Sequence, residues 1–111
     1  MKINLKNERP IINILGEICW GLRLDGFEKK IGVKKAIAET LLKKLLQEEK
    51  SDVIETNITD SELEIIKNAL KEVENEIEEW EFETRIGVTL EEVKNILDSI
   101  ILQGNKSESE N

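Results

Sequence analysis

The apolar residues of this chain fall into four runs with helical spacing, and three of the runs start at residues that favour a helix beginning. Proline is tolerated in the first turn of a helix, so the first helix is expected to begin near Arg9-Pro10. The second is expected at residues 34–49. Thr59–Glu62 and Thr89–Glu92 are capping boxes, in which hydroxyl and carboxylate groups satisfy the first backbone N–H groups, and they predict the third and fourth helices. The apolar positions are, run by run, Ile11, Ile14, Leu15, Ile18 and Leu22; Ile37, Ala38, Leu41, Leu42, Leu45 and Leu46; Leu63, Ile66, Leu70, Val73, Ile77 and Trp80; Leu90, Val93, Ile96, Leu97, Ile100 and Ile101.

The third run repeats at intervals of three and four as far as Trp80, with glutamates on the other faces. This narrow seam predicts a helix packed along a partner helix, either the first helix of the chain or one from another subunit. Gly104 is expected to end the fourth helix, and the polar residues 105–111 are expected to form a disordered tail.

One phrase occurs twice, 55 positions apart. Phe27–Val33 and Phe82–Val88 share Phe, Glu, Ile, Gly and Val in the same order and spacing, and the similarity extends in both directions. Residues 11–46 and 66–101 share ten identical residues in 36 aligned positions without a gap. We interpret these segments as a tandem duplication, called the first and second repeats below, within a single domain at residues 1–104.

The sequence leaves two structures open for the duplicated phrase. Phe27 and Ile31 are four apart and Gly32 follows, which suits a short helical turn closed by glycine. The stretch from Trp80 to Val88 alternates apolar and polar residues, which suits a strand. The predicted fold is mainly α, with two helix–short segment–helix units related by a pseudo-twofold axis. If the duplicated phrases are strands, they add a small two-stranded sheet at the axis. Residues 1–8 read as a short strand or an extended arm.

Composition excludes several classes of protein. The single cysteine, Cys19, allows no intramolecular disulfide and is expected to be a buried structural thiol. The N-terminus lacks the apolar core of a signal peptide, and no apolar run approaches the roughly 20 residues of a membrane span. We therefore expect a cytoplasmic protein.

The sequence has few of the residues and motifs that catalysis commonly uses. The chain has no histidine, so the commonest general base and metal ligand is missing. It has no glycine-rich phosphate-binding loop, no set of zinc ligands and no calcium-loop spacing. We expect no enzyme activity, no cofactor and no metal site.

The net charge of −8 is unevenly distributed: residues 1–55 carry +2 and residues 56–111 carry −10. Such an acidic surface repels nucleic acid and attracts basic partners. It is either a solvated face that keeps the protein soluble or a partner-binding site. The candidate partner-binding residues are Glu72, Glu74, Glu76, Glu78, Glu79, Glu81, Glu83 and Arg85.

Polar residues are also shared between the repeats. Asn13 and Glu17 correspond to Asn68 and Glu72, and a positive charge recurs at Lys30 and Arg85. One interpretation is an internal network, for example Arg85 paired with Glu72 or Glu83, that locks the short segment to the long helix. The other is that these residues contact a partner at the surface.

The stretches Asn68–Val73 and Glu81–Val93 resemble small uncharacterised bacterial proteins associated with immunity to secreted toxins. The resemblance covers roughly residues 60–100 and, more faintly, 11–46. It implies a role, binding and neutralising one cognate toxin, and it assigns no residue, because immunity proteins share neither a fold nor a catalytic motif.

Charge and resemblance together favour a non-enzymatic protein-binding module, an acidic immunity or inhibitor protein that occludes a basic toxin. A second hypothesis is a self-associating structural or regulatory protein, a homodimer in which the basic helix at 34–44 of one chain meets the acidic stretch at 72–83 of another. A third is a helix-turn-helix nucleic-acid binder, which the acidic net charge disfavours.

Overall fold

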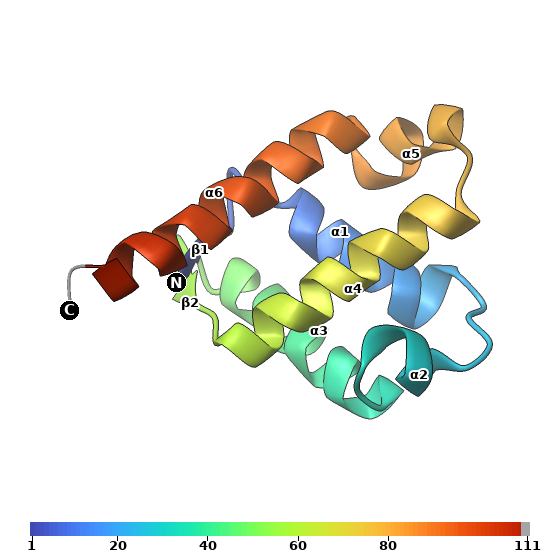
Figure 1. The fold of residues 1–111 in the computed structure, drawn as a ribbon, viewed down its shortest axis with the longest axis horizontal. Helices are drawn as coiled ribbons and strands as arrows, with labels where there is room; N and C mark the ends of the chain where they lie inside the picture. The colour runs from blue at the N-terminus through green and yellow to red at the C-terminus, as the bar shows by residue number, and fades with distance from the viewer. Residues whose placement is uncertain (110–111) are drawn as a thin grey trace.

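The computed structural model describes residues 1–109, with side chains described as far as residue 103, and it is mainly helical with one small sheet (Figure 1). The predicted fold class is therefore confirmed. The elements are β1 (Lys2–Asn4), α1 (Pro10–Gly16), η1 (Glu17–Gly21), α2 (Phe27–Ile31), α3 (Lys35–Lys50), β2 (Glu55–Asn57), α4 (Asp60–Glu76), α5 (Glu79–Ile86) and α6 (Leu90–Ser109).

The pairing of the two strands shows where the pseudo-twofold axis lies. β1 and β2 pair antiparallel, and in their register Lys2 lies opposite Asn57. These two residues are 55 positions apart, the same offset that relates the repeats, so each is the other's counterpart and the axis passes between them. Of the two structures left open for residues 1–8, a short strand is the one formed, and the side chains of Ile3 and Leu5 are buried.

Two side chains accept hydrogen bonds from the backbone N–H groups on the edge of β1 that faces away from β2. The Lys2 N–H donates to Gln103 Oε1 of α6 at 3.3 Å, and the Asn4 N–H donates to Glu8 Oε1 at 2.7 Å. Burial raises the pKa of the Glu8 carboxyl, while the hydrogen bond from Asn4 opposes that rise.

Two corresponding helices, α1 and α4, pack against each other in the centre, with α3 and α6 on opposite sides of them (Figure 1). The core residues Ile14, Leu15, Ile66 and Val73 are fully buried at this junction. The capping box at Thr59 is confirmed, because both reciprocal hydrogen bonds with Glu62 are present.

The apolar seam predicted for the third helix is buried from Leu63 to Ile77, which confirms it as core over that stretch. The prediction is wrong for its last residue, Trp80. α4 stops at Glu76, Ile77 is extended, and Trp80 belongs to α5, where 76% of its surface is exposed. The spacing of apolar residues in the sequence extends past the end of α4 because α5 begins three residues later.

The duplicated phrases are short helices, α2 and α5, so the strand interpretation is wrong and the sheet comes from β1 and β2. Gly32 and Gly87 close the two helices with φ of 94° and 100°, values that L side chains rarely adopt. In α5 only Phe82 and Ile86, four residues apart, are buried, and the alternating partner Trp80 points to solvent.

Each short helix packs on the long helix of the other repeat, α2 on α4 and α5 on α1. Asn68 Nδ2 donates to the Ile31 carbonyl at 2.8 Å, and Asn13 Nδ2 donates to the Ile86 carbonyl at 2.7 Å. These two bonds are counterparts under the pseudo-twofold axis. The shared asparagines therefore join the repeats by satisfying a carbonyl that the helix end leaves unpaired.

The first predicted helix is α1 followed by η1, a single wide turn of π-helix in which the Leu22 N–H donates to the Glu17 carbonyl at 2.6 Å. Such wide turns occur frequently at functional sites. Here the turn buries Ile18 and Cys19 and leaves Trp20 57% exposed.

The predicted helix end at Gly104 is wrong, because α6 continues to Ser109. A glycine costs only about 1 kcal/mol in a helix interior, which its neighbours can offset. Residues 105–109 of the expected disordered tail therefore belong to α6, and residues 110 and 111, the rest of that tail, lie outside the described part of the chain. None of the helices within the described residues is long and apolar enough to cross a membrane.

Candidate functional site

The acidic run predicted as a partner-binding site lies at the corner where α4 ends and α5 begins. α4 ends at Glu76, the buried Ile77 turns the chain, and α5 starts at Glu79. The predicted site residues therefore occupy two helices and a turn instead of one helix face. They are Glu72, Glu74, Glu76, Glu78, Glu79, Glu81, Glu83 and Arg85.

Two of these carboxylates are neutralised by basic side chains. Glu74 Oε1 lies 3.0 Å from Lys94 Nζ, and Glu81 Oε2 lies 3.7 Å from Arg85 Nη1. Glu72 is half-buried against the molecule. The acidic corner, a name used below for the four exposed glutamates, consists of Glu76, Glu78, Glu79 and Glu83.

Trp80 stands within the acidic corner. It follows Glu79, precedes Glu83 by one helical turn, and is the most exposed large apolar side chain of the described residues at 76%. Its counterpart in the first repeat is Asp25, so the fold does not need an aromatic residue at this position. A solvent-exposed tryptophan without a structural task is a candidate contact residue.

Arg85 makes an ion pair with a residue other than Glu72 or Glu83, the partners offered as examples above. Its Nη2 lies 2.8 Å from Glu17 Oε2, and no ion pair with Glu72 or Glu83 is found among the described residues. Glu17 belongs to the first repeat and Arg85 to the second. The internal network is present, but it crosses between repeats because α5 packs on α1.

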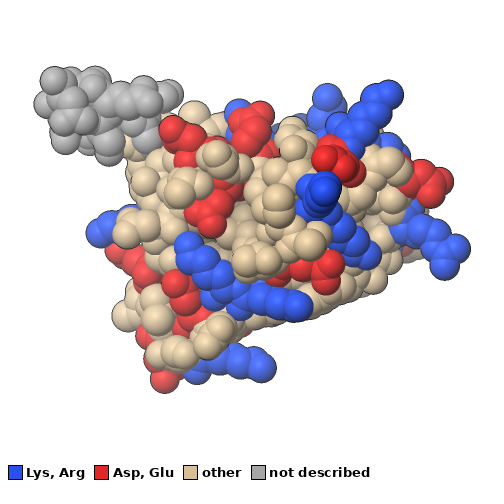
Figure 2. Space-filling view, turned by 90° about the horizontal axis from the view of Figure 1, so that it is seen from below, with Lys and Arg blue, Asp and Glu red and all other residues tan. Residues whose placement is uncertain are grey.

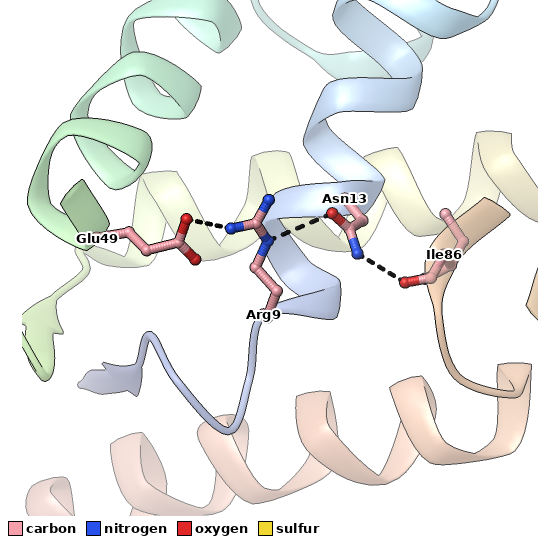
Figure 3. Close-up of polar contacts among 4 residues, drawn as sticks. All are labelled: Arg9, Asn13, Glu49 and Ile86. Atoms are coloured by element: carbon pink, nitrogen blue, oxygen red, sulfur yellow. Dashed lines mark hydrogen bonds and ion pairs between the residues drawn. The ribbon is translucent and has the colours of Figure 1, made fainter.

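A second polar chain begins at the N-terminal end of α1 (Figure 3). Arg9 Nη1 pairs with Glu49 Oε1 of α3, and Arg9 Nε donates to Asn13 Oδ1 at 3.4 Å. The Asn13 amide in turn donates to the Ile86 carbonyl at the end of α5. Three elements, α1, α3 and α5, are thus fixed relative to one another along this line.

An open groove of about 360 Å³ runs over this chain and continues to Trp20. The chemistry of its lining is mixed, with two arginines, a carboxylate, an amide and an indole beside aliphatic side chains. The first-repeat groove, as it is called below, is lined by Arg9, Ile12, Asn13, Gly16, Glu17, Trp20, Gly21, Leu42, Leu46 and Arg85.

Gly21 has no side chain, and this leaves room for the carboxylate of Glu17. A Cβ added at Gly21 would lie 2.8 Å from both Glu17 oxygens, closer than real Cβ contacts. The Glu17 side chain is only 16% exposed, and its Oε2 is buried without a hydrogen bond from the described residues, although Arg85 Nη2 is close. The guanidinium N–H is therefore not aimed at this oxygen.

Sequence reasoning missed Arg9, Trp20 and Glu49 as members of a site. A signal for the groove was present in the differences between the repeats. In the alignment of the repeats, Gly16, Trp20 and Gly21 correspond to Lys71, Asn75 and Glu76, so the first repeat has two glycines and an indole where the second has polar side chains. Such a difference between copies on one fold points to a task beyond folding.

Cys19 is buried, as expected, on the opposite side of η1 from solvent. Burial raises the pKa of its thiol to about 11, and the nearby Glu39 carboxylate adds to the rise. A thiol with this pKa is a poor nucleophile at neutral pH.

Figure 2 shows the lower face of the molecule, where basic and acidic side chains are interspersed. Lys44 on α3 is occupied by the Asn57 carbonyl at 3.3 Å and by Glu62 at 3.7 Å. The visible face therefore presents no continuous basic stripe of the kind that follows a nucleic-acid backbone.

Comparison with known proteins finds no family model, no curated protein and no solved structure that matches the chain. Within the described residues, no group of three or more Cys, Asp or Glu side chains is placed to hold a metal ion. Two surfaces of the described residues are therefore candidate sites, the acidic corner and the first-repeat groove.

Proposed function

We propose that this protein is a non-enzymatic binding module for a basic protein partner, which it contacts through the acidic corner. The observation that carries this proposal is Trp80, 76% exposed among four exposed glutamates. Tryptophan is enriched among the few residues that supply most of the affinity of an interface, and surrounding charges set the rate of encounter and the choice of partner.

In its most concrete form the module is a bacterial immunity protein acting in the cytoplasm. Trp80 would enter a pocket of the toxin, and Glu76, Glu78, Glu79 and Glu83 would cover its basic active-site cleft. The charge of −10 on residues 56–111 suits a basic toxin, and the resemblance suggested above for the second repeat would assign the same role.

The test is capture of partners from a lysate of the organism that encodes the chain, followed by affinity measurement with each isolated partner. Two variants address the site: Trp80→Ala, and Glu76→Lys with Glu83→Lys. The second places lysines near the C-terminal ends of α4 and α5, where the helix dipole favours them, so the fold should tolerate the reversal. The matched control, Glu28→Lys with Asp98→Lys, changes the net charge equally at exposed positions away from the corner.

We expect one basic protein to bind the native chain, with the Kd raised at least tenfold by either site variant and unchanged by the control. Rising salt should slow association more than it speeds dissociation. A partner that binds both site variants as tightly as the native chain would overturn the proposal, and so would an acidic partner.

Self-association remains the alternative, because the basic and acidic halves of the chain are complementary and Ile37 is 52% exposed beside Lys34 and Lys35. Sedimentation equilibrium separates the two proposals. A mass that rises with concentration and falls on reversal of the acidic corner favours self-association. A monomer at all concentrations excludes it.

A further inference from the structure

The two repeats differ in structure where the long helix meets the short one. In the second repeat α4 continues as a regular helix to Glu76, and α5 starts at Glu79. In the first repeat the wide turn η1 takes the place of the last turn of α4, and α2 starts only at Phe27, three positions later than its alignment with α5 would place it. Since the second repeat builds the same helix pair without these changes, the fold does not require them.

The late start of α2 is accompanied by a pocket of about 390 Å³ beside η1. η1 supplies Cys19 and Trp20 to its lining, and the stretch before α2 supplies Leu22, Arg23 and Leu24. This hollow, called the η1–α2 pocket below, has the size of a small-molecule site. Wide helical turns such as η1 are rare and occur frequently at functional sites.

The charged residues that line the η1–α2 pocket are both cationic. They are Arg23 and Lys35, and neither forms an ion pair within the described residues. The carboxylate of Glu39 lies at the rim, because Glu39 follows Lys35 by one helical turn and its Oε2 accepts the Trp20 indole N–H at 3.4 Å. Two positive charges against this one negative charge favour a singly charged anion as the occupant.

The surrounding sequence has the same sign of charge. Residues 20–39 carry five Lys/Arg and three Asp/Glu, a net of +2, whereas the aligned residues 75–94 carry two and seven, a net of −5. Arg23 itself stands where the second repeat has Glu78, a member of the acidic corner. The region around the pocket is therefore positive in a chain whose net charge is −8.

Most of the remaining lining is apolar. Leu22, Leu24 and Phe27 pack on the core but are only partly buried, so they present apolar surface to the pocket. The indole of Trp20, 57% exposed, adds a flat wall. Covering this surface is favourable for an occupant with apolar groups and not for a bare inorganic anion. The lining therefore suits an anion that carries an apolar body.

We propose that the η1–α2 pocket binds a small organic carboxylate, with the carboxylate group at Arg23 and Lys35 and the apolar body against Phe27 and Trp20. A guanidinium binds a carboxylate through two parallel N–H···O bonds, which orient the anion as well as hold it. The pocket belongs to the first repeat and the acidic corner to the second, so this binding does not rest on the proposed function.

The test titrates hexanoate, a carboxylate on an apolar stem, into the isotope-labelled chain and follows its backbone amide and indole N–H resonances by NMR. We expect saturable shifts at Arg23, Lys35 and the Trp20 indole N–H, with a Kd in the millimolar range that suits so small a ligand. The indole N–H of Trp80, the other tryptophan, should not shift and serves as an internal control. Hexylammonium, which reverses the charge, should not saturate, and acetate, which lacks the stem, should bind about tenfold more weakly.

Two variants address the cations. Arg23→Gln and Lys35→Gln should each raise the Kd for hexanoate about tenfold, because each removes one charged partner of the carboxylate. Lys29→Gln is the matched control, since it removes the same charge from an exposed residue of α2 outside the lining, and it should leave the Kd unchanged. Arg23 and Lys35 are themselves exposed, so the fold should tolerate both substitutions, and thermal melts check this.

The proposal is overturned if hexanoate does not saturate, if hexylammonium binds as tightly, or if Lys29→Gln weakens binding as much as Arg23→Gln does. Shifts centred on the Asn13 side-chain amide would place the anion in the first-repeat groove and would also overturn it. Acetate that binds as tightly as hexanoate would do the same, because the apolar body would then contribute nothing.

Discussion

At the scale of single residues, burial decides the chemistry of Cys19. Burial raises its pKa to about 11, so at pH 8 a far smaller fraction of this thiol is ionised than of a free cysteine. Because the thiolate is the nucleophile, we expect iodoacetamide to modify the native chain at least a hundredfold more slowly than the unfolded chain. Mass spectrometry at pH 8 with and without urea measures the ratio, and equal rates would contradict the burial of this thiol.

The polar residues show how far single positions can be predicted. Asn13, Asn68, Glu17 and Arg85 were singled out from the sequence, and each of the four has a polar partner in the folded chain. The predicted partners of Arg85 were glutamates of its own repeat. Spacing along one helix gives the face of a residue but not the copy against which that face packs, and here the copies exchange their short helices.

At the scale of elements, two glycines should respond to the same substitution with opposite sign. Gly87 ends α5 with φ of 100°, where alanine is strained by about 1–2 kcal/mol. Gly16 is the last residue of α1, has helical φ and no atom within 4 Å of an added Cβ, so alanine there should stabilise by up to about 1 kcal/mol. Urea denaturation of Gly87→Ala and Gly16→Ala measures both. Destabilisation of similar size at the two sites would contradict the left-handed end of α5.

Element type was predictable where the pattern was long. The four long apolar runs gave α1, α3, α4 and α6, since periodicity over three or more turns distinguishes a helix from a strand. The duplicated phrase is too short for that test, and glycine conformation together with packing on the opposite repeat decided it. β1 and β2 span three residues each, so only their pairing in the folded molecule identifies them. The first-repeat groove could not be predicted from the sequence either, because its lining residues come from α1, η1, α3 and α5 and meet only in the folded molecule.

At the scale of the whole molecule, the exchange of short helices makes the two repeats one structural unit. α2 completes the packing of α4, α5 completes that of α1, and β1 and β2 share a ladder across the axis. Neither repeat can therefore unfold while the other keeps its full core. A tandem duplication of separate modules would behave differently, with a contact surface between them and independent stability in each.

This exchange predicts a single cooperative unfolding transition that both repeats share. In native-state hydrogen exchange, the most protected amides of α1 and α4 should report the same opening free energy, equal to that from urea denaturation. Asn13→Ala and Asn68→Ala each remove one bond between repeats and should lower the protection of both helices by about 1 kcal/mol. Thr40→Ala is the matched control, since its hydroxyl bonds only the Ala36 carbonyl within α3 and its loss should change stability little. Protection that falls in α1 alone on substitution of Asn13, or two separate urea transitions, would show that the repeats are independent and that the cross-repeat bonds do not couple them.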